Sequence, residues 1–233
     1  MDQSVLQVVM VVVPAWEATE GRLARFERSP DGGWLAVGPS HAVAIGHGGC
    51  GWGSGTHPIP AGSAGPRKRE GDGRSPAGVF TIGTAFGAPP HVATGLAYQA
   101  LDAGHWCVDV PGSPYYNRIV HVDDVGREAV AGSAEPMRRD LHLAGDRAYA
   151  VGFVIGHNPG YERDAGSCIF AHVWNGPGTT TAGCTAMAES DLLRLLAWLR
   201  REARPRFVLL PESERARLAV AWGLPPWPPE DAR

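Results

Sequence analysis

The stretch Ile169-Phe-Ala-His-Val-Trp174, followed by Thr181-Ala-Gly-Cys-Thr185, decides the fold and the chemistry that this sequence predicts. The first segment is apolar and carries β-branched and aromatic residues, which favour a buried β-strand. The second is a polar turn that contains a glycine, where a cysteine has little reason to be present for packing alone. A strand that leads into an exposed-looking turn cysteine suggests a reactive residue.

The chemistry follows from a histidine twelve residues before that cysteine, since His172 precedes Cys184. A cysteine attacks an acyl group as its thiolate, and a nearby imidazole is the usual means of lowering the thiol pKa. The pair therefore indicates cysteine-based acyl transfer. The alternative is that Cys184 is an inert turn cysteine and His172 a hydrogen-bonded core histidine.

Short apolar runs, separated by turns rich in Gly, Pro, Ser and Asn, recur along the whole chain and predict a mainly β fold. The clearest helix is expected over 189–201, where five leucines form an apolar face and Pro205 ends the segment. A second, weaker helix is expected over 133–141. The strand-like runs cover 6–13, 34–37, 42–45, 78–82, 106–110, 118–122, 150–155, 168–174 and 206–210.

Composition excludes several classes of function. The 233 residues carry a net charge of −3, which gives no electrostatic reason to expect nucleic acid or an anionic membrane as partner. No run approaches the roughly 20 apolar residues of a membrane-spanning helix. The apolar stretch Val5–Val13 follows an aspartate and precedes no cleavage site, so we expect a buried first strand and no export signal.

The chain shows no linker between two cores, and we expect one domain over 1–233. Residues 46–78 are glycine-rich and predict a long loop, and 225–233 predict an extended tail. Gly46-His-Gly-Gly-Cys-Gly51 matches a dinucleotide-binding pattern, but the residues after it cannot open the helix that such a site needs. A glycine-rich loop is the better interpretation, and no cofactor is expected.

Four cysteines allow several arrangements. We expect Cys107 and Cys168 to be free and buried. His157, Cys168, His172 and Cys184 are of the types that bind zinc, but strand residues four apart lie roughly 13 Å from each other, so Cys168 and His172 could not share a metal. No metal is predicted. His157 could line the same cleft as Cys184 or cap a turn.

Longer segments resemble a known family. Ser167-Cys-Ile-Phe-Ala-His-Val-Trp174 with Gly176-Pro-Gly-Thr-Thr-Thr-Ala-Gly-Cys-Thr-Ala-Met187 resembles the active-site segment of the L,D-transpeptidases, the YkuD-type catalytic domain. Lys68-Arg-Glu-Gly-Asp-Gly-Arg-Ser-Pro-Ala-Gly-Val-Phe-Thr-Ile82 resembles the motif that enters a strand of that domain, and Ser113-Pro-Tyr-Tyr-Asn117 and Ser133-Ala-Glu-Pro-Met137 resemble a larger subgroup. The resemblance spans essentially the whole chain.

The resemblance implies a β-sandwich-like domain in which Cys184 is the nucleophile and His172 its base. It implies that the Val173 carbonyl holds the imidazole tautomer and that N–H groups near Gly183 and Cys184 stabilise the oxyanion. The acyl donor would be a peptidoglycan stem peptide, the acceptor an amine or water, and carbapenem-type compounds candidate inhibitors. These reactions are L,D-transpeptidation through a thioacyl-enzyme and L,D-carboxypeptidase cleavage.

The chain also departs from the family pattern. Ala182 stands where a second histidine is usual, Ala186 where an Arg or Asn is usual, and the spacing from His172 to Cys184 is shorter. A substitute substrate-binding group is expected in the charged segment that contains Lys68, Arg69, Glu70, Asp72 and Arg74, which could equally be a solvated loop. The further substrate-binding candidates are His157, Trp174 and Thr181.

Two other functions remain compatible with the residues. One is a cytoplasmic relative that forms or hydrolyses an amide bond in a small peptide, and the other is a peptide-binding or peptidoglycan-binding module with a spent site. The family resemblance implies the cell envelope, whereas the expected lack of an export signal leaves the cytoplasm open.

Overall fold

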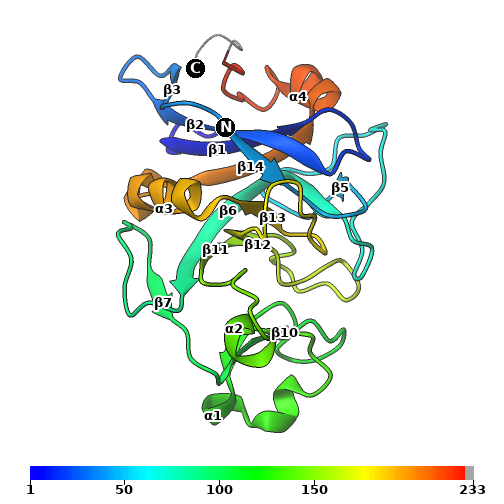
Figure 1. The fold of residues 1–233 in the computed structure, drawn as a ribbon. Coiled ribbons are helices and arrows are strands. Elements are labelled where there is room, and N and C mark those ends of the chain that lie inside the picture. The colour runs from blue at the N-terminus through cyan, green and yellow to red at the C-terminus, as the bar shows by residue number, and fades with distance from the viewer. Residues whose placement is uncertain (229–233) are drawn as a thin grey trace.

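The computed structural model describes residues 1–228, and it confirms a mainly β fold (Figure 1). The strands follow the apolar runs because alternate side chains of each run enter one core. Those of the main sheet are β1 (Gln7–Val13), β2 (Glu20–Arg28), β3 (Trp34–Ala36), β4 (His41–Ala44), β5 (Cys50–Trp52), β6 (Ser75–Gly87), β7 (Tyr98–Ala100), β11 (Val151–Gly156), β12 (Phe170–Val173), β13 (Thr185–Met187) and β14 (Arg206–Pro211).

The main sheet closes on itself. Its strands run in the order β1-β14-β6-β11-β12-β13-β4-β2, and β2 also pairs with β1, so the path returns to its start. The pairs β1–β14 and β12–β13 are parallel, and the other pairs of this ring are antiparallel. A closed ring of this kind has few free strand edges and encloses its apolar side chains.

The core of this barrel is continuous. The expected first strand is present and almost wholly buried, and it packs with β6, β14 and the apolar face of a helix. That helix, α3 (Glu189–Trp198), is three residues shorter than expected, and a 3₁₀ turn over Arg201–Ala203 follows it. Leu192, Leu195 and Leu196 are buried in α3, whereas Leu193 is 41% exposed. A second helix, α4 (Glu212–Leu218), follows β14.

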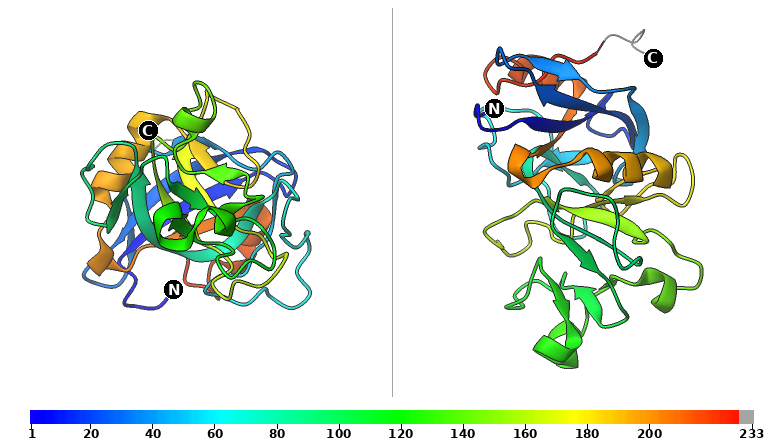
Figure 2. Two further views of the ribbon diagram at one scale, coloured as in Figure 1. Left: turned by 90° about the horizontal axis from the view of Figure 1, so that it is seen from below. Right: turned by 90° about the vertical axis from the view of Figure 1, so that its left-hand side faces the viewer.

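A smaller unit, residues 101–149, extends from one end of the barrel; we call it the lobe (Figure 1 and the right view of Figure 2). It contains a three-stranded antiparallel sheet, β10-β8-β9, of β8 (His105–Cys107), β9 (Ile119–His121) and β10 (Glu135–Pro136). Three short helical turns complete it: α1 (Val122–Val125), a 3₁₀ turn over Arg127–Val130, and α2 (Arg139–His142). The lobe has its own small apolar cluster around Val108, Val122 and Val130.

Two expectations about local structure are wrong in detail. Residues 133–141 do not form one helix, because Glu135 and Pro136 pair with β8 and only 139–142 are helical. The segment 46–78 is not a continuous loop, because it contains β5 and the start of the long strand β6.

The glycines of the segment 46–78 allow close backbone contact, since a Cβ on Gly46 would lie 2.2 Å from the Gly73 carbonyl oxygen. The expected tail, 225–233, lies partly outside the described residues.

The expectation of free Cys107 and Cys168 is also wrong. Their sulfurs form a disulfide that joins β8 of the lobe to the residue two positions before β12. The two cysteines are 61 residues apart in the sequence, and only the folding of the lobe brings β8 beside Cys168. Local sequence patterns therefore could not indicate the disulfide. Cys50 and Cys184 are free and buried.

The disulfide predicts a clear response to reduction. Closing a loop of about 60 residues removes chain entropy from the unfolded state, so we expect the Cys107→Ala variant to unfold about 2–4 kcal/mol more easily than the wild-type protein. Reductant should destabilise the wild-type protein and leave Cys107→Ala unchanged in the same urea titration. Alkylation after denaturation should label two cysteines before reduction and four afterwards; four labels without reductant would contradict the crosslink.

Candidate active site

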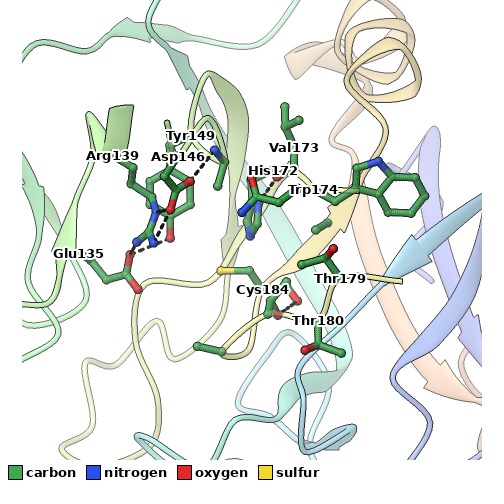
Figure 3. A pocket seen from close by; sticks show the side chains of 15 residues that line it. Glu135, Arg139, Asp146, Tyr149, His172, Val173, Trp174, Thr179, Thr180 and Cys184 are labelled. Atoms are coloured by element: carbon green, nitrogen blue, oxygen red, sulfur yellow. Dashed lines mark hydrogen bonds and ion pairs between the residues drawn. The ribbon is translucent and has the colours of Figure 1, made fainter. Parts of the chain in front are cut away.

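Two neighbouring parallel strands bring the predicted pair together. His172 lies in β12 opposite Ala186 of β13, and Cys184 is the residue just before β13 begins. Both side chains line one cavity of about 190 Å³ (Figure 3). The cavity is lined by Glu135, Arg139, Asp146, Ala148, Tyr149, His172, Val173, Trp174, Asn175, Thr179, Thr180, Thr181, Ala182, Cys184 and Ala186.

The backbone of Cys184 is held from two sides. Its carbonyl oxygen accepts hydrogen bonds from the Ser75 hydroxyl at 2.9 Å and the Thr181 hydroxyl at 2.7 Å. The preceding Gly183 has a φ of +150°, and a Cβ there would lie 3.0 Å from the Arg74 carbonyl oxygen, so this position requires glycine. Ser75 and Gly183 therefore fix the position of the Cys184 backbone.

The Cys184 thiol is buried and neutral at rest. Its sulfur accepts the Phe170 N–H at 3.3 Å, and its S–H donates to the Cys168 carbonyl at 3.5 Å. Burial raises the thiol pKa to about 12, with the Glu135 carboxylate as a further cause. The Phe170 N–H, Lys68 and the Tyr149 hydroxyl act in the opposite direction and do not outweigh burial. At neutral pH the thiol is therefore protonated.

His172 is a neutral imidazole with one ring nitrogen hydrogen-bonded to the backbone. Its Nδ1 lies 2.8 Å from the Val173 carbonyl oxygen, and because a carbonyl can only accept, Nδ1 carries the proton. Nε2 is then left with a lone pair. Burial lowers the imidazole pKa to about 4, so the ring is uncharged at neutral pH. Figure 3 shows the Cys184 sulfur directed into the space between the His172 ring and the Glu135–Tyr149 side of the cavity.

The lobe supplies the other side of the cavity, and sequence reasoning missed its residues. The Tyr149 hydroxyl donates to Glu135 Oε2 at 2.7 Å, and its ring packs edge-on against His172. The Arg139 guanidinium lies over the Tyr149 ring, 2.7 Å from Asp146 and 3.5 Å from Glu135 (Figure 3). The motif Ser133-Ala-Glu-Pro-Met137 was a signal for this region, but nothing local in it indicated a cavity.

Of the expected substrate-binding residues, Trp174 and Thr181 line the cavity, and the charged segment does not. The Lys68 ammonium is buried and pairs with Asp72 at 2.6 Å, and Asp72 also accepts the backbone N–H groups of Arg69 and Arg74. Glu70 accepts hydrogen bonds from the Tyr116 and Ser167 hydroxyls. These carboxylates organise the segment that leads into β6, and only the Arg69 side chain is exposed.

His157 lies apart from the cavity. Its Nε2 lies 2.9 Å from the Ala165 carbonyl oxygen, which it can only meet as a donor, and its ring packs edge-on against Phe80. Burial lowers its pKa to about 4. Of the two expectations for this residue, the contacts favour support of the 157–166 turn. The Gly183 N–H, expected at the oxyanion, donates to the Thr181 hydroxyl at 3.1 Å in this state.

The groups able to ligate a metal lie in two places, in the segment around the cavity and in the lobe. The disulfide removes Cys168 from any set with His157, His172 and Cys184. In the lobe, Asp102 Oδ1 lies 2.9 Å from both His105 Nδ1 and His121 Nε2. Backbone N–H groups of Asp102 and Asp123 donate to His105 Nδ1 and His121 Nδ1, so a metal there would require both amides to turn away. A His105 Nδ1 that accepts the Asp102 N–H cannot also donate to the Asp102 carboxylate, so hydrogen bonds satisfy only part of this cluster.

Comparison with known proteins adds one finding. A family model described as the L,D-transpeptidase catalytic domain, YkuD, matches residues 37–208. This segment contains the cavity, Ser75, the lobe and both ends of the disulfide. Searches of curated proteins and of solved structures gave no match. Within the described residues, no helix is long and apolar enough to cross a membrane.

The two buried histidines predict how stability changes with pH. Each has a folded-state pKa of about 4 against an ordinary value of 6.5, so between these values the unfolded chain binds more protons. Stability should therefore fall as the pH drops from about 6.5 to about 4, by up to roughly 3 kcal/mol for each histidine. Urea unfolding of the wild-type protein and of His157→Gln and His172→Gln measures this.

In that comparison, each Gln variant should lose less stability on acidification than the wild-type protein does. His91→Gln, at an exposed position, is the matched control and should keep the wild-type slope. Identical slopes in all four proteins would show that the buried imidazoles do not resist protonation.

Proposed function

The chain belongs to the L,D-transpeptidase (YkuD) catalytic-domain family, and we propose that it catalyses cysteine-dependent acyl transfer on peptidoglycan stem peptides. The observation that carries this proposal is the shared cavity of a free thiol, Cys184, and a neutral imidazole with an available Nε2, His172. A spent binding module would have no need to retain both groups in this arrangement.

Acylation would begin with proton transfer from the Cys184 thiol to His172 Nε2 as the sulfur attacks the substrate carbonyl carbon. The tetrahedral intermediate then loses the amine of the terminal D-residue, which takes the proton from His172, and a thioester to Cys184 remains. Because thiol and imidazole are both buried and neutral, the ion pair forms only as the substrate is attacked. The Val173 carbonyl stabilises the imidazolium through Nδ1–H.

In the second half-reaction an acceptor amine or water attacks the thioester, gives its proton to His172, and releases the Cys184 thiolate, which recovers that proton. An amine gives transpeptidation and water gives carboxypeptidase cleavage. We propose that N–H groups at Gly183 and Cys184 stabilise the oxyanion in both steps. For Gly183 this requires the hydrogen bond to the Thr181 hydroxyl to exchange for the substrate oxygen.

Substrate contacts differ from the family pattern at two alanines. Ala182 and Ala186 line the cavity and offer no polar group there, and Ala186 is buried between β12 and β4. The charged groups of the lining come instead from Glu135, Arg139 and Asp146 of the lobe. We infer that these residues, with Trp174 and Thr181, contact the stem peptide in place of the charged segment around Lys68.

We place the protein in the cell envelope. Peptidoglycan lies outside the cytoplasm, and the Cys107–Cys168 disulfide is of a kind that persists in oxidising compartments. The same crosslink argues against the cytoplasmic peptide-modifying alternative, since thiols are kept reduced there.

The proposal predicts products that mass spectrometry distinguishes. Incubation with disaccharide-tetrapeptide should yield crosslinked dimer, tripeptide, or both, and should leave an acyl adduct on Cys184. Cys184→Ala and His172→Ala should lose at least ~10³-fold in rate. A carbapenem should add to the wild-type protein and not to Cys184→Ala.

Cys50→Ala is the matched control, because it removes a free, buried cysteine that lies outside the cavity. Turnover that persists in Cys184→Ala would refute the mechanism. Binding of the peptide without product or carbapenem adduct would identify a binding module instead.

A further inference from the structure

The charges that line the cavity do not cancel. Its lining contains two carboxylates, Glu135 and Asp146, and one guanidinium, Arg139. The thiol and the imidazole are neutral at rest. Arg139 can neutralise only one of the two carboxylates, so the other has no positive partner of its own in the cavity lining. An unpaired charge is costly in a buried site.

Contacts identify Glu135 as the carboxylate with the weaker partner. Asp146 forms the closer pair with Arg139, with nitrogen–oxygen distances of 2.7 and 2.8 Å, and also accepts the Ala148 N–H. Glu135 lies 3.5 Å from the same guanidinium. The hydrogen bonds that the described residues make to the Glu135 carboxylate both end on Oε2, which leaves Oε1 available to the cavity.

Lys68, whose charge acts on the Cys184 thiol, does not supply the missing positive charge. Its ammonium is bonded to Asp72 and to the Arg69 carbonyl, and it does not line the cavity. Asp109, beyond the cavity lining, adds negative charge near Glu135. Burial, with the Asp109 carboxylate as a further cause, raises the pKa of Glu135, so a positive group brought into the cavity by a bound molecule would favour its charged form.

The position of Glu135 is also fixed relative to the nucleophile. Glu135 pairs with Cys107 in the β10–β8 ladder, and Cys107 is bonded to Cys168. The Cys168 carbonyl and the Phe170 N–H are the two groups that hold the Cys184 thiol. The strand pairing, the disulfide and the hydrogen bonds to the thiol together fix where Glu135 lies relative to Cys184. Figure 3 shows the Glu135 carboxylate across the cavity from the sulfur.

We propose that the Glu135 carboxylate binds an ammonium group of the substrate and so selects substrates that carry one near the reacting carbonyl. This inference rests on the proposed function of the same cavity. The chemistry is the same whether the ammonium belongs to the side chain of the acyl donor or to the incoming acceptor amine. Such a charge-assisted hydrogen bond is strong in a partly buried site.

Glu135→Gln tests the proposal, because the amide keeps the shape and the acceptor oxygen for Tyr149 while removing the charge. The first arm measures binding of a diaminopimelate-containing tetrapeptide to Cys184→Ala and to Cys184→Ala/Glu135→Gln by calorimetry. The peptide is used with its side-chain amine free and with that amine acetylated. If the donor supplies the ammonium, Glu135→Gln should weaken binding of the free-amine peptide roughly tenfold or more and leave the acetylated peptide unchanged.

The second arm measures how the acyl-enzyme divides between acceptors. Glycinamide arrives as an ammonium and hydroxylamine as an uncharged nucleophile. If the acceptor supplies the ammonium, Glu135→Gln should reduce the yield with glycinamide relative to hydroxylamine by a similar factor, with the ratio to hydrolysis measured in the same reaction. Glu128→Gln, which removes an exposed carboxylate of the lobe outside the cavity lining, should keep the wild-type ratios in both arms.

The outcomes separate the two claims. A loss of preference for the charged ligand in either arm supports the role of Glu135 and identifies the source of the ammonium. Equal losses for charged and uncharged ligands, or no change in either arm, overturn it, because a merely structural role affects both alike. The binding arm needs no turnover, so a protein that forms no acyl-enzyme would refute the proposed function and still decide the role of Glu135.

Discussion

The carbonyl of Cys184, held between the hydroxyls of Ser75 and Thr181, is the contact on which the site depends. Ser75 begins β6, the strand that pairs with four others, and its hydroxyl also accepts the Gly46 N–H. The turn that carries Cys184 is therefore hydrogen-bonded to a central strand of the barrel. Gly183 makes this approach possible, because any side chain there would meet the Arg74 carbonyl.

Hydrogen bonds fix the position of Cys184, and burial sets the protonation states of Cys184 and His172. A thiol with a raised pKa and an imidazole with a lowered one form an uncharged pair, the reverse of a preformed thiolate–imidazolium ion pair. Such a resting state protects the sulfur from oxidation and adventitious electrophiles, which react with thiolates. Activation is then tied to the arrival of a carbonyl group at the sulfur.

Sequence reasoning succeeded where the determinant was local. The strands at β1, β11, β12 and β14 follow apolar runs, and Cys184 and His172, which the structure brings to one cavity, belong to one short segment. Their roles as nucleophile and base stay predictions. Sequence reasoning failed where a contact depends on how separate segments pack in the fold. The disulfide, the Lys68–Asp72 pair and the contact of Glu135 with Tyr149 each depend on how the lobe and the segment before β6 pack. Charge in the Lys68 segment looked like a binding site, whereas it stabilises its own backbone.

The lobe and the barrel contribute different parts of the same cavity. Cys184 and His172 come from adjacent barrel strands, whereas Glu135, Arg139 and Asp146 come from a segment inserted between β7 and β11. Selectivity can therefore diverge without altering the reacting pair, provided that an exchanged insert keeps the ladder partner and the cysteine that tie it to the residue before Ile169. For protein engineering, the segment between β7 and β11 could be exchanged as a unit, with the end of β7 and the start of β11 as its boundaries.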